Sequence, residues 1–212
     1  MTIQNLGVRD GYSNLGVPRL PRLREVTLID HSEEVNPPFF CDDDFASVKK
    51  LTFITTCGWL DYDVTCIRRF RSIRVLILKN DGFYDNHIGA HDPSSLMPAE
   101  LSLLETLTLS GKVSHRILDK IRAPGLRKME IEADGAHGRH SLVASHLVHM
   151  VGLLERLCVS FNKDMHETSW VEELERLIAE APPLVSVWVS PWMARCVIGK
   201  EWCFKLHVTD PK

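Results

Sequence analysis

The chain has 212 residues, of which 44% are hydrophobic and 25% are charged, a composition typical of a globular protein. Its 25 Lys and Arg residues against 28 Asp and Glu residues give a formal net charge of −3, so nucleic acid is not expected as a partner because no large basic field is available. The most apolar stretch, residues 142–154, is interrupted by His146 and His149 and is too short to cross a bilayer, so no membrane partner is expected.

In chain order, the main pattern is a phrase of the form apolar-x-x-apolar-x-apolar that recurs eight times. Its occurrences are Leu23-Val26-Leu28, Val48-Leu51-Phe53, Ile73-Leu76-Leu78, Leu104-Leu107-Leu109, Leu126-Met129-Ile131, Leu154-Leu157-Val159, Leu184-Val187-Val189 and a degraded Cys203-Leu206-Val208. Subtracting successive first positions gives intervals of 25, 25, 31, 22, 28, 30 and 19 residues. Period-two alternation predicts a strand at each phrase, near residues 23–30, 48–55, 73–79, 104–110, 126–132, 154–160, 184–190 and 203–209.

The segments between the phrases predict helices or loops. Apolar residues at helical spacing predict helices over residues 114–121, 138–153 and 169–181, the last with a Ser169 cap and Glu172 three residues later. Prolines, glycines and an aspartate run predict loops over residues 31–47 and 80–98.

Self-similarity at this period is typical of a solenoid, and the L-x-x-L-x-L core is that of a leucine-rich repeat. We therefore predict an α/β leucine-rich-repeat solenoid, an irregular horseshoe in which about eight short strands form a parallel concave sheet with helices or loops outside. Because the phrases run without a gap, residues 1–212 are predicted to form one domain. The first strand is expected to leave the N-terminal end open, and residues 192–202 with the charged tail are expected to cap the other end.

Several pre-strand sequences resemble the leucine-rich-repeat half of fungal F-box proteins, in which "L-P-x-L" or "A-P-x-L" introduces many repeats. The residues that carry the resemblance are Leu20-Pro21-Arg22-Leu23, Ala123-Pro124-Gly125-Leu126, Leu153-Leu154-Glu155-Arg156-Leu157 and Ala181-Pro182-Pro183-Leu184. The resemblance covers about residues 20–210 and is specific for the fold but not for the target.

The resemblance implies a non-enzymatic protein-interaction module, the substrate-recognition part of an F-box type ubiquitin-ligase receptor. In that family an upstream F-box docks onto the ligase adaptor and the repeats hold a protein substrate. The 22 residues before the first phrase are too few for an F-box, so the adaptor is expected as a partner only if an F-box is encoded upstream and this chain is a fragment. The alternative is a stand-alone scaffold or regulator without ubiquitin chemistry.

Neither catalysis nor a cofactor is predicted. There is no Gly-rich phosphate loop, no G-x-S-x-G elbow and no catalytic cysteine signature. His87, His91 and Asp92, the His137-x-x-His140 and His146-x-x-His149 pairs, and the aspartates at 42–44 lack the partners of a metal site, and only a metal found at His87, His91 and Asp92 would favour an enzyme. The six cysteines are scattered without a C-x-x-C pair, and residues 1–14 are no signal peptide, so a cytoplasmic or nuclear location is expected.

The concave face is the predicted binding surface, because residues that alternate with the buried ones face outward. Two groups are singled out on it. An exposed aliphatic patch is expected from Ile29, Ile54, Val75 and Ile77, and interface anchors and charges from Lys128, Glu130, Arg156, Trp188, Lys205 and His207. Two alternatives remain open: missing N-terminal repeats or the loop at 80–98 could cover the patch, and Trp188 could pack against Trp192 or Trp202.

Overall fold

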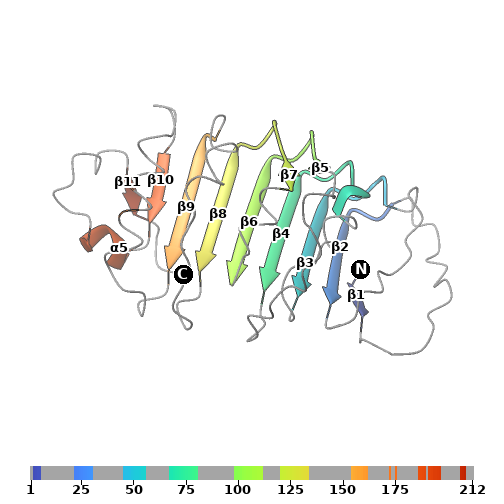
Figure 1. Cartoon of the computed structure of the whole chain (residues 1–212), viewed down its shortest axis with the longest axis horizontal. Helices are drawn as coiled ribbons and strands as arrows, with labels where there is room; N and C mark the ends of the chain where they lie inside the picture. The colour runs from blue at the N-terminus through green and yellow to red at the C-terminus, as the bar shows by residue number, and fades with distance from the viewer. Residues whose placement is uncertain are drawn as a thin grey trace.

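The fold is built on a long parallel sheet in which strand order follows chain order (Figure 1). A computed structural model describes residues 2–5, 22–30, 45–55, 67–80, 98–111, 120–133, 154–161, 172, 175, 186–189, 191–196 and 206–208. The strands, in sheet order, are β1 (Thr2–Asn5), β2 (Glu25–Asp30), β3 (Lys50–Thr55), β4 (Val75–Asn80), β6 (Thr106–Gly111), β8 (Lys128–Ala133), β9 (Arg156–Phe161), β10 (Ser186–Val189) and β11 (Leu206–Val208). Every neighbouring pair is parallel, so the predicted parallel sheet is confirmed, and the architecture is consistent with an α/β fold.

Each predicted strand range overlaps one observed strand, but the strands begin two or three residues later than the phrases. The reason is a turn that precedes the strand. The N–H groups of Val48, Ile73, Leu104 and Leu126 each donate to the carbonyl three residues before, at 3.0, 3.2, 3.0 and 3.1 Å. The first apolar residue of the phrase therefore closes a β-turn, and the strand proper starts after it.

The core lies against one face of the sheet. In β3 buried and half-buried side chains alternate, as period-two geometry requires, and Leu51 and Phe53 are 0% and 3% exposed. The register places Leu51, Leu76, Leu107, Met129, Leu157 and Val187 side by side on successive strands. Repetition of one apolar position along the sheet thus produces a continuous apolar layer.

Buried residues outside the phrase add to this core, among them three large ones at the starts of the turns. Phe45, Phe70 and Leu101 open the turns before β3, β4 and β6 and are 1%, 0% and 0% exposed. The rings of Phe45 and Phe70, from adjacent turns, pack against each other at a tilt of 34° with centroids 4.8 Å apart. Burying each ring removes a large apolar area from water, which makes these turns a main source of stability.

The N-terminal end differs from the prediction. β1 pairs in parallel with β2, with Thr2 opposite Thr27 and Ile3 opposite Leu28. The prediction that the sheet is open at the N-terminal edge of β2 is therefore wrong. A segment with the single apolar residue Ile3 carries no phrase, and its strand conformation depends on pairing with β2 rather than on its own pattern.

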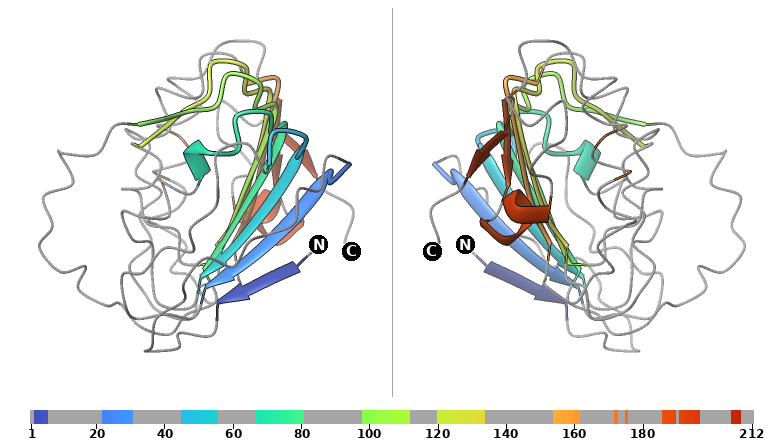
Figure 2. Two further views of the ribbon diagram at one scale, coloured as in Figure 1. Left: turned by 90° about the vertical axis from the view of Figure 1, so that its right-hand side faces the viewer. Right: turned by 90° about the vertical axis from the view of Figure 1, so that its left-hand side faces the viewer.

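A second small sheet and one unpredicted helix lie outside the main sheet. β5 (Ala99–Glu100) pairs with β7 (Ile121–Arg122), and Figure 2 shows both set off to one side of the main sheet. The helix predicted over 114–121 is wrong at its end, since Ile121 is in β7 and pairs with Ala99; residues 112–119 lie outside the described part. The helix α5 (Pro191–Cys196) was not predicted.

The other predicted helices and loops are only partly covered. Glu172 and Glu175 are helical, in keeping with the helix predicted over 169–181, whereas residues 138–153 lie outside the described part. Of the predicted loops, only residues 45–47, 80 and 98 are described: 45–47 form the turn before β3, whereas Asn80 is the last residue of β4, so the second loop was predicted to begin one residue too early.

At Gly125 two successive turns approach each other closely. A Cβ atom built on Gly125 would lie 2.9 Å from the carbonyl oxygen of Ser102 and 3.4 Å from that of Leu104. Both neighbours are backbone atoms, so they cannot rotate away as a side chain would.

We expect Gly125→Ala to lower the free energy of unfolding by roughly 1–3 kcal/mol, because the turns must separate to admit the methyl group. Urea denaturation followed by circular dichroism measures the change. Pro124→Ala, at an exposed position of the same turn, is the control. An unchanged or raised stability for Gly125→Ala would show that the two turns do not pack as described.

Candidate partner-binding face

The face of the sheet opposite the core carries half-buried and exposed side chains, and we call it the open face. The register arranges its side chains in rows that cross the strands. The middle row runs through Thr27, Thr52, Ile77, Thr108, Glu130, Cys158, Trp188 and His207. Adjacent members stand about 4.8 Å apart, the spacing between strands, so each can contact the next.

The predicted aliphatic patch lies on this face but is less exposed than expected. Ile29 pairs directly with Ile54, whereas the positions beside Ile77 and Val75 on β3 are Thr52 and Lys50. All four aliphatic side chains are half-buried. Their flanks are close to side chains of the neighbouring strands at strand spacing, which accounts for part of this burial. The prediction of an exposed patch was therefore wrong, and the exposed large apolar residue found in the described part is Leu103, in the turn before β6.

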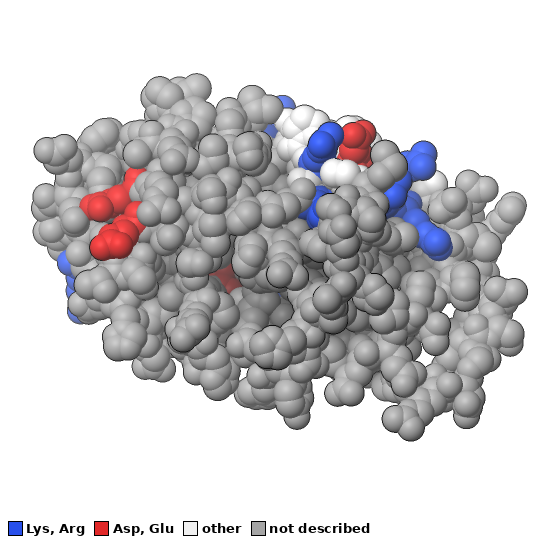
Figure 3. Space-filling model, viewed as in Figure 1, with Lys and Arg blue, Asp and Glu red and all other residues white. Residues whose placement is uncertain are grey.

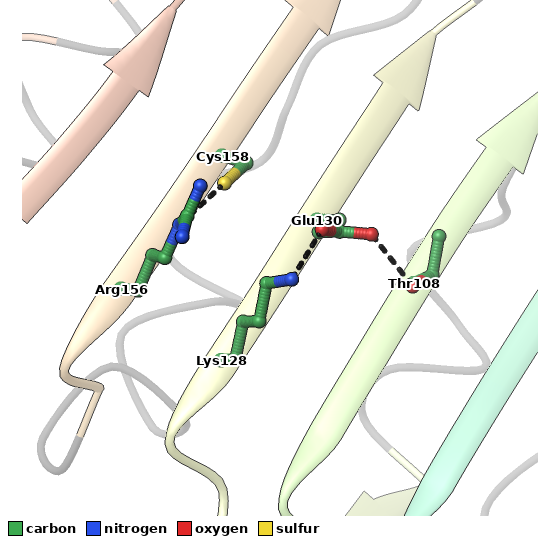
Figure 4. Close-up of polar contacts among 5 residues, drawn as sticks. All are labelled: Thr108, Lys128, Glu130, Arg156 and Cys158. Atoms are coloured by element: carbon green, nitrogen blue, oxygen red, sulfur yellow. Dashed lines mark hydrogen bonds and ion pairs between the residues drawn. The ribbon is translucent and has the colours of Figure 1, made fainter. Parts of the chain in front are cut away.

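The centre of the open face is polar and internally bonded. Lys128 Nζ lies 2.7 Å from Glu130 Oε1, and the Thr108 hydroxyl donates to Glu130 Oε2 at 3.2 Å (Figure 4). Because Lys128 and Glu130 remain 37% and 32% exposed, the ion pair contributes only about 0–1 kcal/mol to stability. The two contacts hold the carboxylate in a defined orientation between β6 and β8.

Beyond Glu130, three side chains from β9, β10 and β11 form a stack, in which Trp188 and His207 belong to the middle row and Arg156 lies two residues before Cys158 on β9. The guanidinium carbon of Arg156 lies 4.2 Å from the centroid of the Trp188 ring. His207 stacks on Trp188 with centroids 4.8 Å apart and planes inclined by 21°. We call Arg156, Trp188 and His207 the Arg–Trp–His stack. A cation over an indole contributes roughly 0.5–1 kcal/mol at such sites. Because Arg156 and His207 both contact the Trp188 ring, they also fix its orientation.

Cys158 positions the guanidinium of this stack. Arg156 Nε donates to Cys158 Sγ at 3.2 Å, and both residues belong to β9, two positions apart on the same face (Figure 4). Cys158 is a free, half-buried cysteine that faces Trp188 directly in the register. The arginine is therefore held at its Nε atom from one side and by the indole from the other.

The structure thus brings five of the predicted site residues into one stretch of the open face: Lys128, Glu130, Arg156, Trp188 and His207. The aliphatic residues lie in a separate stretch on β2–β4, and Lys205 lies outside the described residues. Thr108 and Cys158 also take part in the contacts, although neither is among the residues singled out from the sequence. The strand register, which sets Thr108 beside Glu130 and Cys158 beside Trp188, is the signal that identifies them.

The alternative packing of Trp188 is partly resolved. Its ring contacts Arg156 and His207, while the Trp192 side chain and Trp202 lie outside the described part of the chain.

Two other features, a metal site and a membrane-spanning helix, are absent from the residues that the structure describes. These residues contain no group of three or more His, Cys, Asp or Glu side chains that could hold a metal ion, and the aspartates at 42–44 and the predicted histidine pairs lie outside them. No helix in the described ranges is long and apolar enough to cross a membrane. No known protein family, curated protein or solved structure matches the chain.

Proposed function

We propose that this chain is a leucine-rich-repeat solenoid that binds a protein partner through its open face. The Arg–Trp–His stack is the observation that carries the proposal. Trp and Arg are the residues most enriched at the energetic centres of protein interfaces, and here they are placed together and held by neighbouring side chains. A side chain whose orientation is already fixed loses less entropy on binding, which favours affinity.

Regular backbone hydrogen bonds between successive strand-containing units support the solenoid part of the proposal. The carbonyl group before each of β2, β3, β4, β6 and β8 accepts hydrogen bonds from two consecutive N–H groups that begin the next strand of the main sheet. For Arg24 these donors are Lys49 and Lys50, at 2.8 and 3.1 Å. A unit that bonds mainly to its two neighbours is the organisation expected of a repeat protein.

The resemblance of the pre-strand sequences to fungal F-box proteins supports a role in substrate recognition by a ubiquitin ligase. A stand-alone scaffold is the second candidate, since the resemblance concerns only the repeat part. Purification of the endogenous protein with an antibody against residues 190–212, followed by mass spectrometry, separates the two. F-box peptides, the ligase adaptor and a species well above 24.1 kDa would support the ligase role, whereas a species of that mass without the adaptor would support the scaffold.

We expect Trp188→Ala to weaken capture of the partner by a factor of about 30 or more, as loss of an interface anchor costs about 2 kcal/mol. The measurement is quantitative mass spectrometry of proteins that immobilised wild type and variant retain from an extract of the cells that make the protein. Arg156→Gln should weaken capture of the same proteins, because it removes the cation held over the indole.

Two controls accompany this measurement. Ser160→Ala, at an exposed position of the open face on β9, should retain wild-type capture. The melting temperature of Trp188→Ala should fall by only about 2–4 °C, since a half-buried side chain contributes about 1 kcal/mol in a chain of this size. Unchanged capture together with a large loss of stability would show that Trp188 is a structural residue and would refute the proposal.

A further inference from the structure

The residue before each strand occupies an equivalent position in successive turns, and these residues form a row along the edge at which the strands begin. The shared backbone contact defines the row: the carbonyl of one member accepts the N–H of the next, at 2.8–2.9 Å. In order, its members are Arg24, Lys49, Arg74, Glu105, Arg127 and Glu155. Their side chains therefore follow one another at about the spacing of adjacent strands.

From Arg74 onward the charges in this row alternate and are paired. Arg74 Nη1 lies 3.1 Å from Glu105 Oε1, and Arg127 Nη1 lies 3.2 Å from Glu155 Oε1. One residue after the row, at the first position of each strand, Lys50 of β3 is likewise paired with Glu25 of β2 at 3.3 Å. Opposite charges on neighbouring strands are the arrangement that stabilises a sheet.

Among the residues that the structure describes, the first three members of the row lack this alternation. Arg24, Lys49 and Arg74 are three consecutive cations, and only Arg74 is paired with an acidic residue among those described. Arg24 instead donates from Nη1 to the carbonyl oxygen of Ser47 at 3.2 Å. Like charges at strand spacing repel, so this stretch is maintained at a small cost in stability.

Further cations surround this stretch. Arg71 lies in the turn before β4, Arg68 lies just before that turn, Arg22 lies before β2, and all three are exposed. We call Arg22, Arg24, Lys49, Arg68 and Arg71 the basic edge; within the described part of the chain none of the five forms an ion pair with an acidic side chain. Figure 3 shows Lys and Arg side chains, with an acidic side chain among them, at its upper right, where β2, β3 and β4 begin in the same view.

The chemistry of the basic edge fits carboxylates better than nucleic acid. Binding of single-stranded nucleic acid requires aromatic side chains on which bases can stack, and the aromatic residues of these turns, Phe45 and Phe70, are 1% and 0% exposed. A short extended acidic segment places carboxylates about 6.6–6.8 Å apart on each side, within reach of flexible Arg and Lys side chains that start from adjacent turns.

We infer that the basic edge binds an acidic, Asp- and Glu-rich segment of a protein partner. The inference rests on the proposed function, because it assigns a chemical class to part of the partner, but it concerns a surface separate from the Arg–Trp–His stack. The acidic segment would supply the negative charges that the N-terminal half of the row lacks.

Fluorescence polarisation with a fluorescein-labelled glutamate dodecamer tests the inference, with a glutamine dodecamer and an oligothymidylate of the same length for comparison. At about 50 mM NaCl the glutamate peptide should bind and the glutamine peptide should not, and the affinity should fall as salt is raised. The triple variant Arg24→Gln, Lys49→Gln, Arg71→Gln should bind the glutamate peptide about tenfold or more weakly.

A matched triple variant separates the site from net charge. Arg122→Gln, Arg127→Gln, Arg195→Gln removes the same number of charges from exposed positions outside the basic edge, and it should bind within about twofold of wild type, with circular dichroism confirming that both triple variants are folded. Equal weakening by both triple variants, no binding of the glutamate peptide, or tighter binding of the oligothymidylate would each overturn the inference. Trp188→Ala should leave binding of the glutamate peptide unchanged. The basic-edge triple variant therefore tests this inference, whereas Trp188→Ala tests the proposed function.

Discussion

Replacement of Leu107 by Asp is expected to unfold the centre of the sheet. Leu107 is fully buried in β6, between Leu76 of β4 and Met129 of β8. An aspartate there would be either charged without a partner or forced to take up a proton, and it would also lose the apolar contacts of leucine. The combined cost of about 4–5 kcal/mol or more is comparable to the whole stability of a typical domain.

Thr106→Asp is the matched control for this change. Thr106 lies one residue earlier in the same strand, on the open face, with Lys128 beside it in the register. The same charge should therefore change stability by only about 0.5 kcal/mol there. Thermal unfolding followed by circular dichroism measures both variants. A melting temperature for Leu107→Asp within about a degree of wild type would show that the two faces have been assigned wrongly.

Replacement of Phe70 by Ala is expected to lower the free energy of unfolding by about 3–5 kcal/mol. Phe70 is fully buried in the turn before β4, and its ring lies 4.8 Å from that of Phe45, at an angle of 34°. The change removes apolar contacts both from the turn of Phe70 and from the turn of Phe45. These turns are too well packed to close the cavity. Urea denaturation of the variant and the wild type gives the difference.

A double-mutant cycle with Phe45→Ala tests whether the two rings stabilise each other. The coupling energy should be about 0.5–1.5 kcal/mol, the range measured for aromatic pairs. Phe70→Leu, which retains most of the apolar volume, should cost less than Phe70→Ala. A loss below about 1 kcal/mol for Phe70→Ala would mean that these turns do not belong to the core.

The strands were predictable because their pattern is local. In Leu51-x-Phe53 and its equivalents, the alternation of apolar and polar residues determines both the strand and the buried face. Other elements depend on distant residues. Ile121 follows Ile117 and Leu118 at helical spacing, yet it pairs with Ala99 of β5. Ile3 is a single apolar residue whose strand requires β2 as a template. In both cases tertiary pairing overrides a weak local signal.

The strand and face of each site residue could be predicted from the sequence, because both follow from the strand register. Alternation placed Arg156 and Trp188 on one face, and the repeat made them neighbours. It did not show that Cys158 would bond to the guanidinium or that Thr108 would bond to Glu130, since these contacts depend on side-chain conformation. The basic edge was missed for a different reason. A net charge summed over the chain contains no information about which turns the cations occupy.

The most direct test of the central claim, that the open face binds the partner, is site-specific photo-crosslinking in the cells that make the protein. The photoreactive amino acid benzoylphenylalanine would replace Ser160, which is exposed on the open face, or Glu100, which is exposed in the small sheet. We expect position 160 to crosslink a protein that position 100 does not reach, and we expect Trp188→Ala to abolish that product. An equal yield of the same product from both positions, or a product from position 160 that persists in Trp188→Ala, would contradict the claim.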